Sequence, residues 1–145
     1  MAGRRALNKA IIDTDIFSEI SKGVNPTVAA HAKTYHRAFG HYTVTVVTVM
    51  EIVQGYQQKH AARQLQAFLA ALPSQEVLAF DETDAELAGL IAGELEYTGR
   101  PIGTADSMIA AIAIGLGLEL VTGNTAHFQR VQQLGYPLTL INWRQ

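Results

Sequence analysis

Short apolar runs alternate with longer amphipathic segments along most of the chain. The short runs are rich in β-branched residues, which is typical of buried strands. In the longer segments the apolar residues recur three and four positions apart, which predicts helices. The predicted strands cover residues 10–12, 42–47, 77–80, 119–122 and 138–141. The predicted helices cover residues 15–21, 26–38, 48–56, 58–71, 81–97, 105–116 and 125–134.

Because strands and helices alternate, the pattern favours an α/β fold. Strands that are joined through helices run parallel, and a parallel sheet is normally covered on both faces. We therefore expect a single domain over residues 1–145. Its sheet should be small and mainly parallel, with four to five strands flanked by helices on both faces.

Polar residues mark the predicted beginnings of two helices. Thr48 and Glu51 match the capping box S/T-x-x-E, so a helix is expected to begin at Thr48. Thr104 is expected to cap the helix 105–116. Nearly every face of that helix is apolar, which predicts that it is deeply buried.

Composition narrows the class of protein. Hydrophobic residues make up 48% of the chain and charged residues 17%, which fits a folded domain with a substantial core. The absence of cysteine excludes disulfides and thiolate metal sites. The net charge of −2 indicates no broad basic surface. The longest apolar stretch, 108–118, is too short to span a bilayer, and Arg4 and Arg5 are not followed by a signal-peptide core. We expect a cytoplasmic protein without a membrane segment.

Isolated acids follow the predicted strands or begin the predicted helices. Asp13 comes directly after the first strand and Asp15 two residues later. Glu51 and Asp106 each lie in the predicted first turn of a helix, and Asn124 follows the fourth strand. The carboxyl ends of parallel strands share one edge of the sheet, which is where ligands bind in such folds. These five side chains are therefore expected to lie close together.

Each acid also has a purely structural interpretation. Asp13 or Asp15 suits the N-cap of the next helix, and Glu51 suits the second position of a capping box. Asp106 at a helix start interacts favourably with the helix dipole. Each role explains one residue, and none explains why the acids share one edge of the sheet.

A shared site would favour a divalent cation. Crowded carboxylates raise one another's pKa unless a cation lies between them. Oxygen ligands without cysteine favour Mg²⁺ or Mn²⁺ over Zn²⁺. Sites of this kind hold phosphate substrates and activate water for in-line attack.

Four segments resemble, in the same order, the sequence blocks of PIN-domain ribonucleases, and within that family the VapC toxins of type II toxin–antitoxin systems. They are residues 12–16, 48–55, 101–111 and 120–128. The resemblance implies that Asp13, Glu51 and Asp106 are the catalytic, metal-binding acids. Asn124 takes the fourth, more variable position, and Asp15 is a further candidate ligand. None of the four segments contains lysine or arginine, so the metal-free site is expected to be strained by repulsion.

The resemblance also implies an activity and partners. The chain is expected to be a Mg²⁺- or Mn²⁺-dependent endoribonuclease that cleaves RNA by metal-activated water, with tRNA among the candidate substrates. A VapB-like antitoxin and a second copy of the chain are the expected partners. Two residues depart from the family pattern. Asp15 stands where relatives often have Asn, and His127 where many have Asp or Glu, so the number of metal ions stays open.

Two alternatives compete with the nuclease. Asp13-x-Asp15 also occurs in haloacid-dehalogenase-like phosphatases, but Phe17 stands where those enzymes have Thr or Val, and their downstream Lys and Gly-Asp pair have no counterpart here. The other alternative is a non-catalytic α/β interaction module whose acids act only as caps. Four histidines lie outside the matched segments without ligand spacing and are expected to be structural or solvated: His31, His36, His41 and His60.

Overall fold

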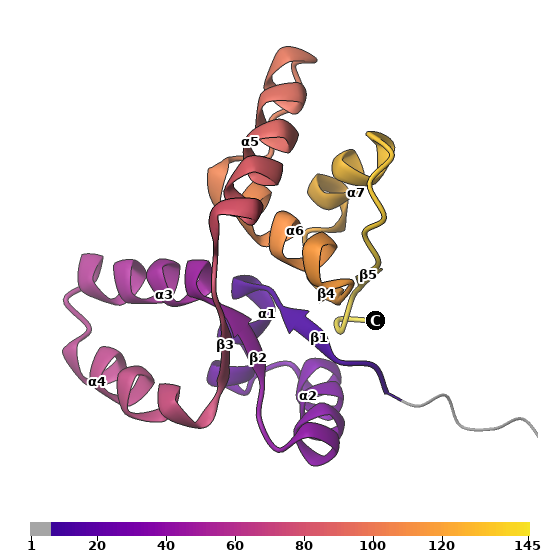
Figure 1. Ribbon diagram of the computed structural model, residues 1–145. Coiled ribbons are helices and arrows are strands. Elements are labelled where there is room, and N and C mark those ends of the chain that lie inside the picture. Colours follow the sequence, from indigo (N-terminus) through magenta and orange to yellow (C-terminus); the bar gives the residue numbers. More distant parts are fainter. Residues whose placement is uncertain (1–6) are drawn as a thin grey trace, which may run out of the picture.

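The computed structural model describes residues 7–145, so Arg4 and Arg5 lie outside the described residues (Figure 1). The strands are β1 (Ala10–Ile12), β2 (Thr43–Thr45), β3 (Glu76–Leu78), β4 (Glu119–Val121) and β5 (Leu140–Ile141). The helices are α1 (Thr14–Lys22), α2 (Pro26–Phe39), α3 (Val46–Gln58), α4 (Ala62–Ala71), α5 (Glu82–Tyr97), α6 (Thr104–Leu116) and α7 (Thr125–Gln133), with a short 3₁₀ turn η1 (Leu72–Ser74). Within the described part of the chain, no helix combines the length and apolar character that crossing a membrane requires.

All five strands pair in parallel, as predicted, but they form two ladders. The first has the order β1-β4-β5 and the second is β2-β3. The Tyr35 hydroxyl separates the ladders, because it accepts from the Ala10 N–H at 3.2 Å and donates to the Ala10 carbonyl at 3.1 Å. The same hydroxyl lies 2.8 Å from Thr43 Oγ1 on β2. A buried side chain thus occupies backbone groups of β1 on the side where β2 would pair.

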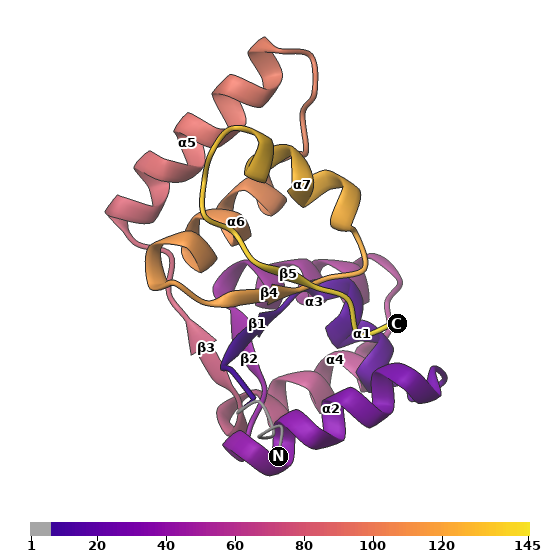
Figure 2. The same cartoon turned by 90° about the vertical axis from the view of Figure 1, so that its right-hand side faces the viewer.

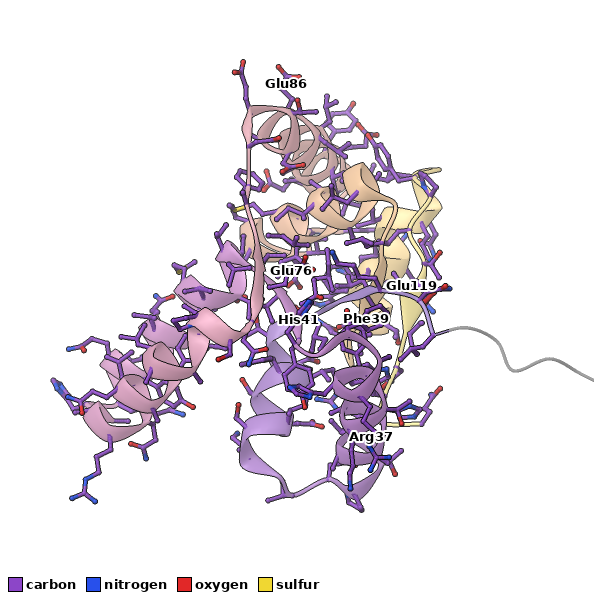
Figure 3. All side chains as sticks on the ribbon, turned by 60° about the horizontal axis from the view of Figure 1, so that its bottom comes forward. Arg37, Phe39, His41, Glu76, Glu86 and Glu119 are labelled. Atoms are coloured by element: carbon purple, nitrogen blue, oxygen red, sulfur yellow. The ribbon has the colours of Figure 1, made fainter. Side chains whose placement is uncertain are left out.

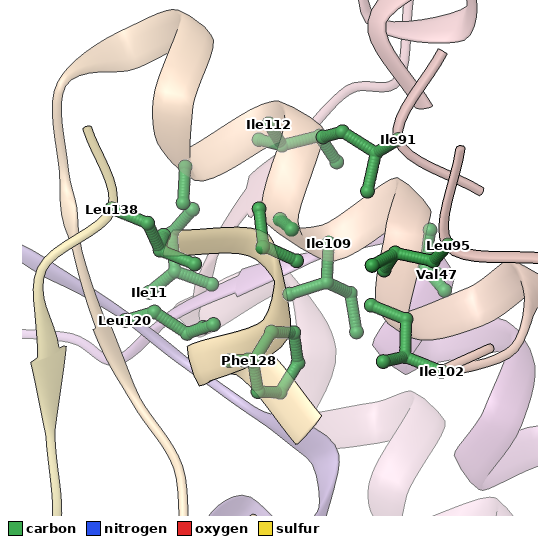
Figure 4. Close-up of a cluster of buried hydrophobic side chains, with 13 residues drawn as sticks. Ile11, Val47, Ile91, Leu95, Ile102, Ile109, Ile112, Leu120, Phe128 and Leu138 are labelled. Atoms are coloured by element: carbon green, nitrogen blue, oxygen red, sulfur yellow. The ribbon is translucent and has the colours of Figure 1, made fainter. Parts of the chain in front are cut away.

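The helices pack on both faces of the strands, which confirms the predicted α/β layers (Figures 1 and 2). Neighbouring residues of β1 point to opposite faces, as strand geometry requires. Ile11 belongs to the core under α5, α6 and α7, together with Ile109 and Phe128 (Figure 4). Ile12 belongs to the core that includes residues of α1 and α2. The predicted burial of α6 is confirmed by an unbroken run of buried residues from Ile109 to Ala113.

Five predicted helix starts differ from the structure, and those of α3, α4 and α6 also change the predicted caps or element boundaries. α3 begins at Val46, because the Thr45 side chain caps it by accepting from the Thr48 N–H at 3.3 Å. Residues 46 and 47 therefore belong to the helix and not to the strand 42–47. α6 is preceded by Gly103 at a φ of 92°, and Thr104 is already helical. α3 continues to Gln58 and α4 begins at Ala62, so the predicted helix 58–71 begins too early.

The strands are also shorter than predicted: β3 ends at Leu78, β4 at Val121, and β5 begins at Leu140. At their amino-terminal ends the polar contacts are ordinary structural pairs. Lys9 Nζ lies 2.6 Å from Glu76 Oε1, and Asn8 donates to Glu119 at 2.6 Å. Figure 3 labels Glu76, Glu119 and His41 on this side of the molecule. The predicted acids lie at the opposite, carboxyl-terminal ends of the strands.

Candidate metal centre

A pocket of about 500 Å³ lies where β1 and β4 end and α1, α6 and α7 begin. Every predicted site residue lines it, although the residues come from distant parts of the chain. The lining consists of Asp13, Thr14, Asp15, Glu51, Asp106, Gly123, Asn124 and Arg144. The expectation that the acids share one edge of the sheet is therefore met by the geometry.

Asp13 is the most buried acid of the pocket, with 5% of its surface exposed. It caps α1, and its Oδ1 accepts from the Thr14 N–H at 2.8 Å. Its Oδ2 accepts from the Thr122 hydroxyl at 2.8 Å. Burial, together with the charges of Asp15 and Asp106, raises the pKa of Asp13 to about 7, although the two hydrogen bonds oppose the shift. The capping role proposed for Asp13 is real, but it does not relieve the cost of burying the charge.

Asp106 lies in the first turn of α6, as predicted. Its Oδ2 is 3.5 Å from His127 Nδ1. Burial raises the pKa of Asp106, the His127 hydrogen bond opposes this, and the charge of Glu51 adds to the increase. Two neighbouring carboxyl groups, Asp13 and Asp106, thus have pKa values above their ordinary range and repel each other when ionised.

Glu51 lies in the second turn of α3 and has no part in capping that helix, because Thr45 is the N-cap. The capping-box interpretation of Glu51 is therefore wrong. Its Oε1 accepts from the Thr14 hydroxyl at 2.7 Å, and that hydroxyl is also 2.9 Å from Thr48 Oγ1. Thr14, at the start of α1, thus holds the Glu51 carboxylate at the pocket.

Asp15 and Asn124 are held by backbone and side-chain groups of the pocket wall. Asp15 Oδ1 accepts from the Ile16 N–H at 2.7 Å, and its Oδ2 accepts from the Gly123 N–H at 3.0 Å. The Asn124 side chain makes no capping bond to α7, and its Nδ2 is 2.9 Å from His127 Nδ1. The same His127 nitrogen thus lies within 3.5 Å of both the Asn124 amide and the Asp106 carboxylate.

Arg144 was missed by the sequence analysis. Its Nε and Nη2 lie 2.7 and 2.6 Å from Glu19 Oε1, and Nη2 is 3.6 Å from Asp15 Oδ2. Gly123 leaves room for it, since a Cβ there would collide with the guanidinium and crowd the Asp15 carboxylate. The glycine directly after the fourth strand was the signal for a close approach. No local pattern pointed to the arginine itself.

The donor set fits a hard divalent cation. Within residues 7–145, no group of three or more histidine, aspartate or glutamate side chains is arranged to enclose one ion. Mg²⁺ does not need such a cage, because it is commonly held by one or two carboxylates, with waters and substrate phosphates completing its shell. Asp13 and Asp106 provide two adjacent carboxyl groups whose raised pKa values a cation would lower again.

Comparison with known proteins shows which family this chain belongs to. The model of the PIN domain family matches residues 10–134 of the chain. The tRNA(fMet)-specific endonuclease VapC of Shigella flexneri is 37% identical over 93 residues, which cover 63% of this chain and 70% of that protein. The enzyme of the same name from Salmonella typhimurium is 35% identical over 89 residues, or 61% of this chain and 67% of that one. The DNA-bound VapBC structure from Salmonella typhimurium superposes with a TM-score of 0.77 at 25% identity, covering 94% of this chain and 99% of that one.

The chain belongs to the PIN domain family, whose nucleases depend on divalent cations. Within that family it is one of the VapC-like toxin endoribonucleases of toxin–antitoxin systems, as its sequence resemblance implied. This membership decides against the haloacid-dehalogenase-like phosphatase and against a module without catalytic function.

Proposed function

We propose that the chain, as a single domain over residues 1–145, cleaves RNA at Asp13, Glu51 and Asp106, with Mg²⁺ or Mn²⁺ held by Asp13 and Asp106. The observation that carries this proposal is the meeting of these three acids in one pocket, where the buried Asp13 has a pKa of about 7. A carboxyl group whose pKa lies close to physiological pH is typical of a functional site.

The chain's own residues have separate tasks in this proposal. Asp13 and Asp106 hold the ion, with Asn124 as a further oxygen donor at the pocket wall. A divalent cation supplies Lewis-acid stabilisation of the charge that develops on the phosphate during in-line attack. Glu51, held by the Thr14 hydroxyl, orients the attacking water and accepts its proton. His127 positions Asp106, and Thr122 positions Asp13.

We infer that the RNA is a tRNA, because both curated relatives bear the name tRNA(fMet)-specific endonuclease. We also infer that a VapB-like antitoxin binds this chain, because solved structures of similar fold are VapBC complexes. A homodimer is supported by apolar residues that α5 leaves exposed, among them Leu90 at 65% and Tyr97 at 88%.

The nuclease proposal is tested with purified protein and an initiator tRNA transcript. Wild type should cut the RNA in Mg²⁺ or Mn²⁺ and not in EDTA. Asp13→Asn and Asp106→Asn should lose cleavage, since a neutral amide is a poor ligand for Mg²⁺. Glu86→Gln is the matched control, because it removes one exposed carboxylate from α5 outside the pocket. A folded Asp106→Asn variant that cuts at the wild-type rate would contradict the proposed site.

A further inference from the structure

Arg144 brings a positive charge into a pocket that is otherwise acidic. Among the described residues that line the pocket, it is the only lysine or arginine, opposite four carboxylates. Its guanidinium is held from one side by Glu19, through Nε and Nη2, and lies near Asp15. Both carboxylates come from α1, the helix that Asp13 caps.

The backbone around Arg144 is anchored in the core. The preceding Trp143 is buried at 4% exposure, with its ring 5.9 Å from that of Tyr35 and stacked at 6.0 Å on that of His31. The Arg144 N–H donates to the Asn142 side chain at 2.9 Å. The chain end therefore lies beside α1, as Figure 2 shows, and holds Arg144 at the pocket.

The direction of the guanidinium is also fixed. Its Nη1 lies against the backbone of Gly123, in a space that any side chain at this position would fill. Within residues 7–145, no hydrogen bond or ion pair is formed by Nη1. The arginine side chain remains 37% exposed, so a molecule that enters the pocket can reach it.

We propose that Arg144 binds a phosphate of the RNA substrate at the edge of the metal centre, with Glu19 and Asp15 holding its guanidinium in position. This inference rests on the proposed nuclease function, because it needs RNA to enter the pocket. A phosphate that approaches four carboxylates is repelled unless cations offset their charge. The planar donors of arginine match phosphate oxygens better than the point charge of lysine does. Asp15 is then a positioning residue for Arg144, since its Oδ1 and Oδ2 already accept from the Ile16 and Gly123 N–H groups.

The test measures RNA binding separately from cleavage. The probe is a labelled initiator tRNA transcript, and every protein carries Asp106→Asn so that the RNA stays intact. Arg144→Gln and Arg144→Lys are compared with Arg63→Gln, which removes one charge from an exposed position of α4 away from the pocket. Dissociation constants are determined over a series of salt concentrations. Mn²⁺ affinity and thermal midpoints are measured for the same substitutions in the chain with Asp106 intact.

Arg144→Gln should weaken RNA binding by about tenfold and lower the salt slope by about one, as expected for the loss of one phosphate contact. The RNA affinity of Arg144→Lys should lie between that of Arg144→Gln and that of the protein carrying Asp106→Asn alone. Arg63→Gln should change the affinity by less than about twofold. Mn²⁺ affinity should not fall in Arg144→Gln, since the substitution removes a cation from beside the acids.

The inference is overturned if Arg144→Gln matches Arg63→Gln in affinity and salt slope and only lowers the thermal midpoint. Arg144 would then merely tie the chain end to α1. Binding of RNA that depends on Arg144, in a protein that binds no Mn²⁺ and cuts no RNA, would support this phosphate contact while contradicting the nuclease proposal. Failure of the Arg144 inference and failure of the nuclease proposal thus give different results.

Discussion

Thr122 donates a 2.8 Å hydrogen bond to Asp13 across the boundary between β4 and β1. The bond follows from the strand register. Ile12 and Val121, the last residues of β1 and β4, are paired, so the polar residues that follow them also lie side by side. Both residues are buried, so the hydroxyl is a fixed partner that favours the ionised form of Asp13.

Thr122→Val should therefore raise the pKa of Asp13 still further and weaken metal binding at neutral pH. A hydrogen bond to a charged group is worth about 1.5 kcal/mol or more, which corresponds to about one pKa unit, so the Mn²⁺ affinity at pH 7 should fall roughly sevenfold. The loss should shrink at pH 9, where Asp13 is ionised in both proteins. Calorimetric titration at the two pH values makes the comparison, with the exposed Thr139→Val as the control. An equal loss at both pH values would mean that Thr122 acts through packing.

The raised pKa of Asp13 should appear in the pH dependence of stability. Burial raises this pKa from 3.8 to about 7 in the folded protein. The folded state therefore binds this proton more tightly than the unfolded state. The resulting stabilisation is complete below pH 3.8 and is lost as pH rises towards 7. At about 1.4 kcal/mol per pKa unit, the loss is at most about 4 kcal/mol.

Asp13→Asn removes this contribution and keeps a good helix cap. In EDTA, the free energy of unfolding of the variant relative to wild type should increase between pH 4 and pH 8. Urea unfolding at several pH values measures this difference. A difference that stays constant with pH would show that the carboxyl group of Asp13 titrates normally.

Glu51 should act on water more than on the metal. Glu51→Gln retains an oxygen for the Thr14 hydroxyl but can no longer accept a proton, so kcat should fall by roughly 10²-fold or more. The Mn²⁺ dissociation constant should change far less than in Asp13→Asn. Single-turnover cleavage and metal titration of both variants make the comparison. If the two variants lose metal affinity equally, Glu51 is a ligand.

Much of the pocket was predictable because its polar side chains lie near the ends of strands and the starts of helices. Asp13, Asp106 and Asn124 directly follow strands or begin helices, and parallel strands bring such positions to one edge. The start of α3 was not predictable in this way. Thr48 and Glu51 match a capping box, yet Thr45 caps the helix and a tertiary contact with Thr14 holds Glu51. A local sequence rule was outweighed by packing between distant segments.

The position of Arg144 also could not be predicted from local sequence. It is separated from Glu19 by 125 positions in the sequence, and their contact depends on the path of the chain after β5. The four matched segments contain no lysine or arginine, but the folded pocket does contain a positive charge, that of Arg144. Arg144 offsets part of the charge of Asp15, whereas the charge of Asp106 still raises the pKa of Asp13.

The mutual repulsion of those two acids leads to the last prediction. Without metal, Asp106→Asn should melt at a higher temperature than wild type, because it removes one charge from beside the buried Asp13. Removing an anion from the first turn of α6 works in the other direction and costs about 0.3–1 kcal/mol. We expect the repulsion to outweigh it, since burial and the charges of Glu51 and Asp15 all raise the pKa of Asp106. Function at this position would then oppose stability.

Metal should reverse the order of the two proteins. At a hundredfold excess of Mn²⁺ over its Kd, wild type should gain about 2.7 kcal/mol, and Asp106→Asn should gain much less. Thermal melting in EDTA and in a Mn²⁺ series measures both effects, with Glu86→Gln as the control for loss of one negative charge. If Asp106→Asn melts lower than wild type in EDTA and gains as much from Mn²⁺, the acids do not form one metal site.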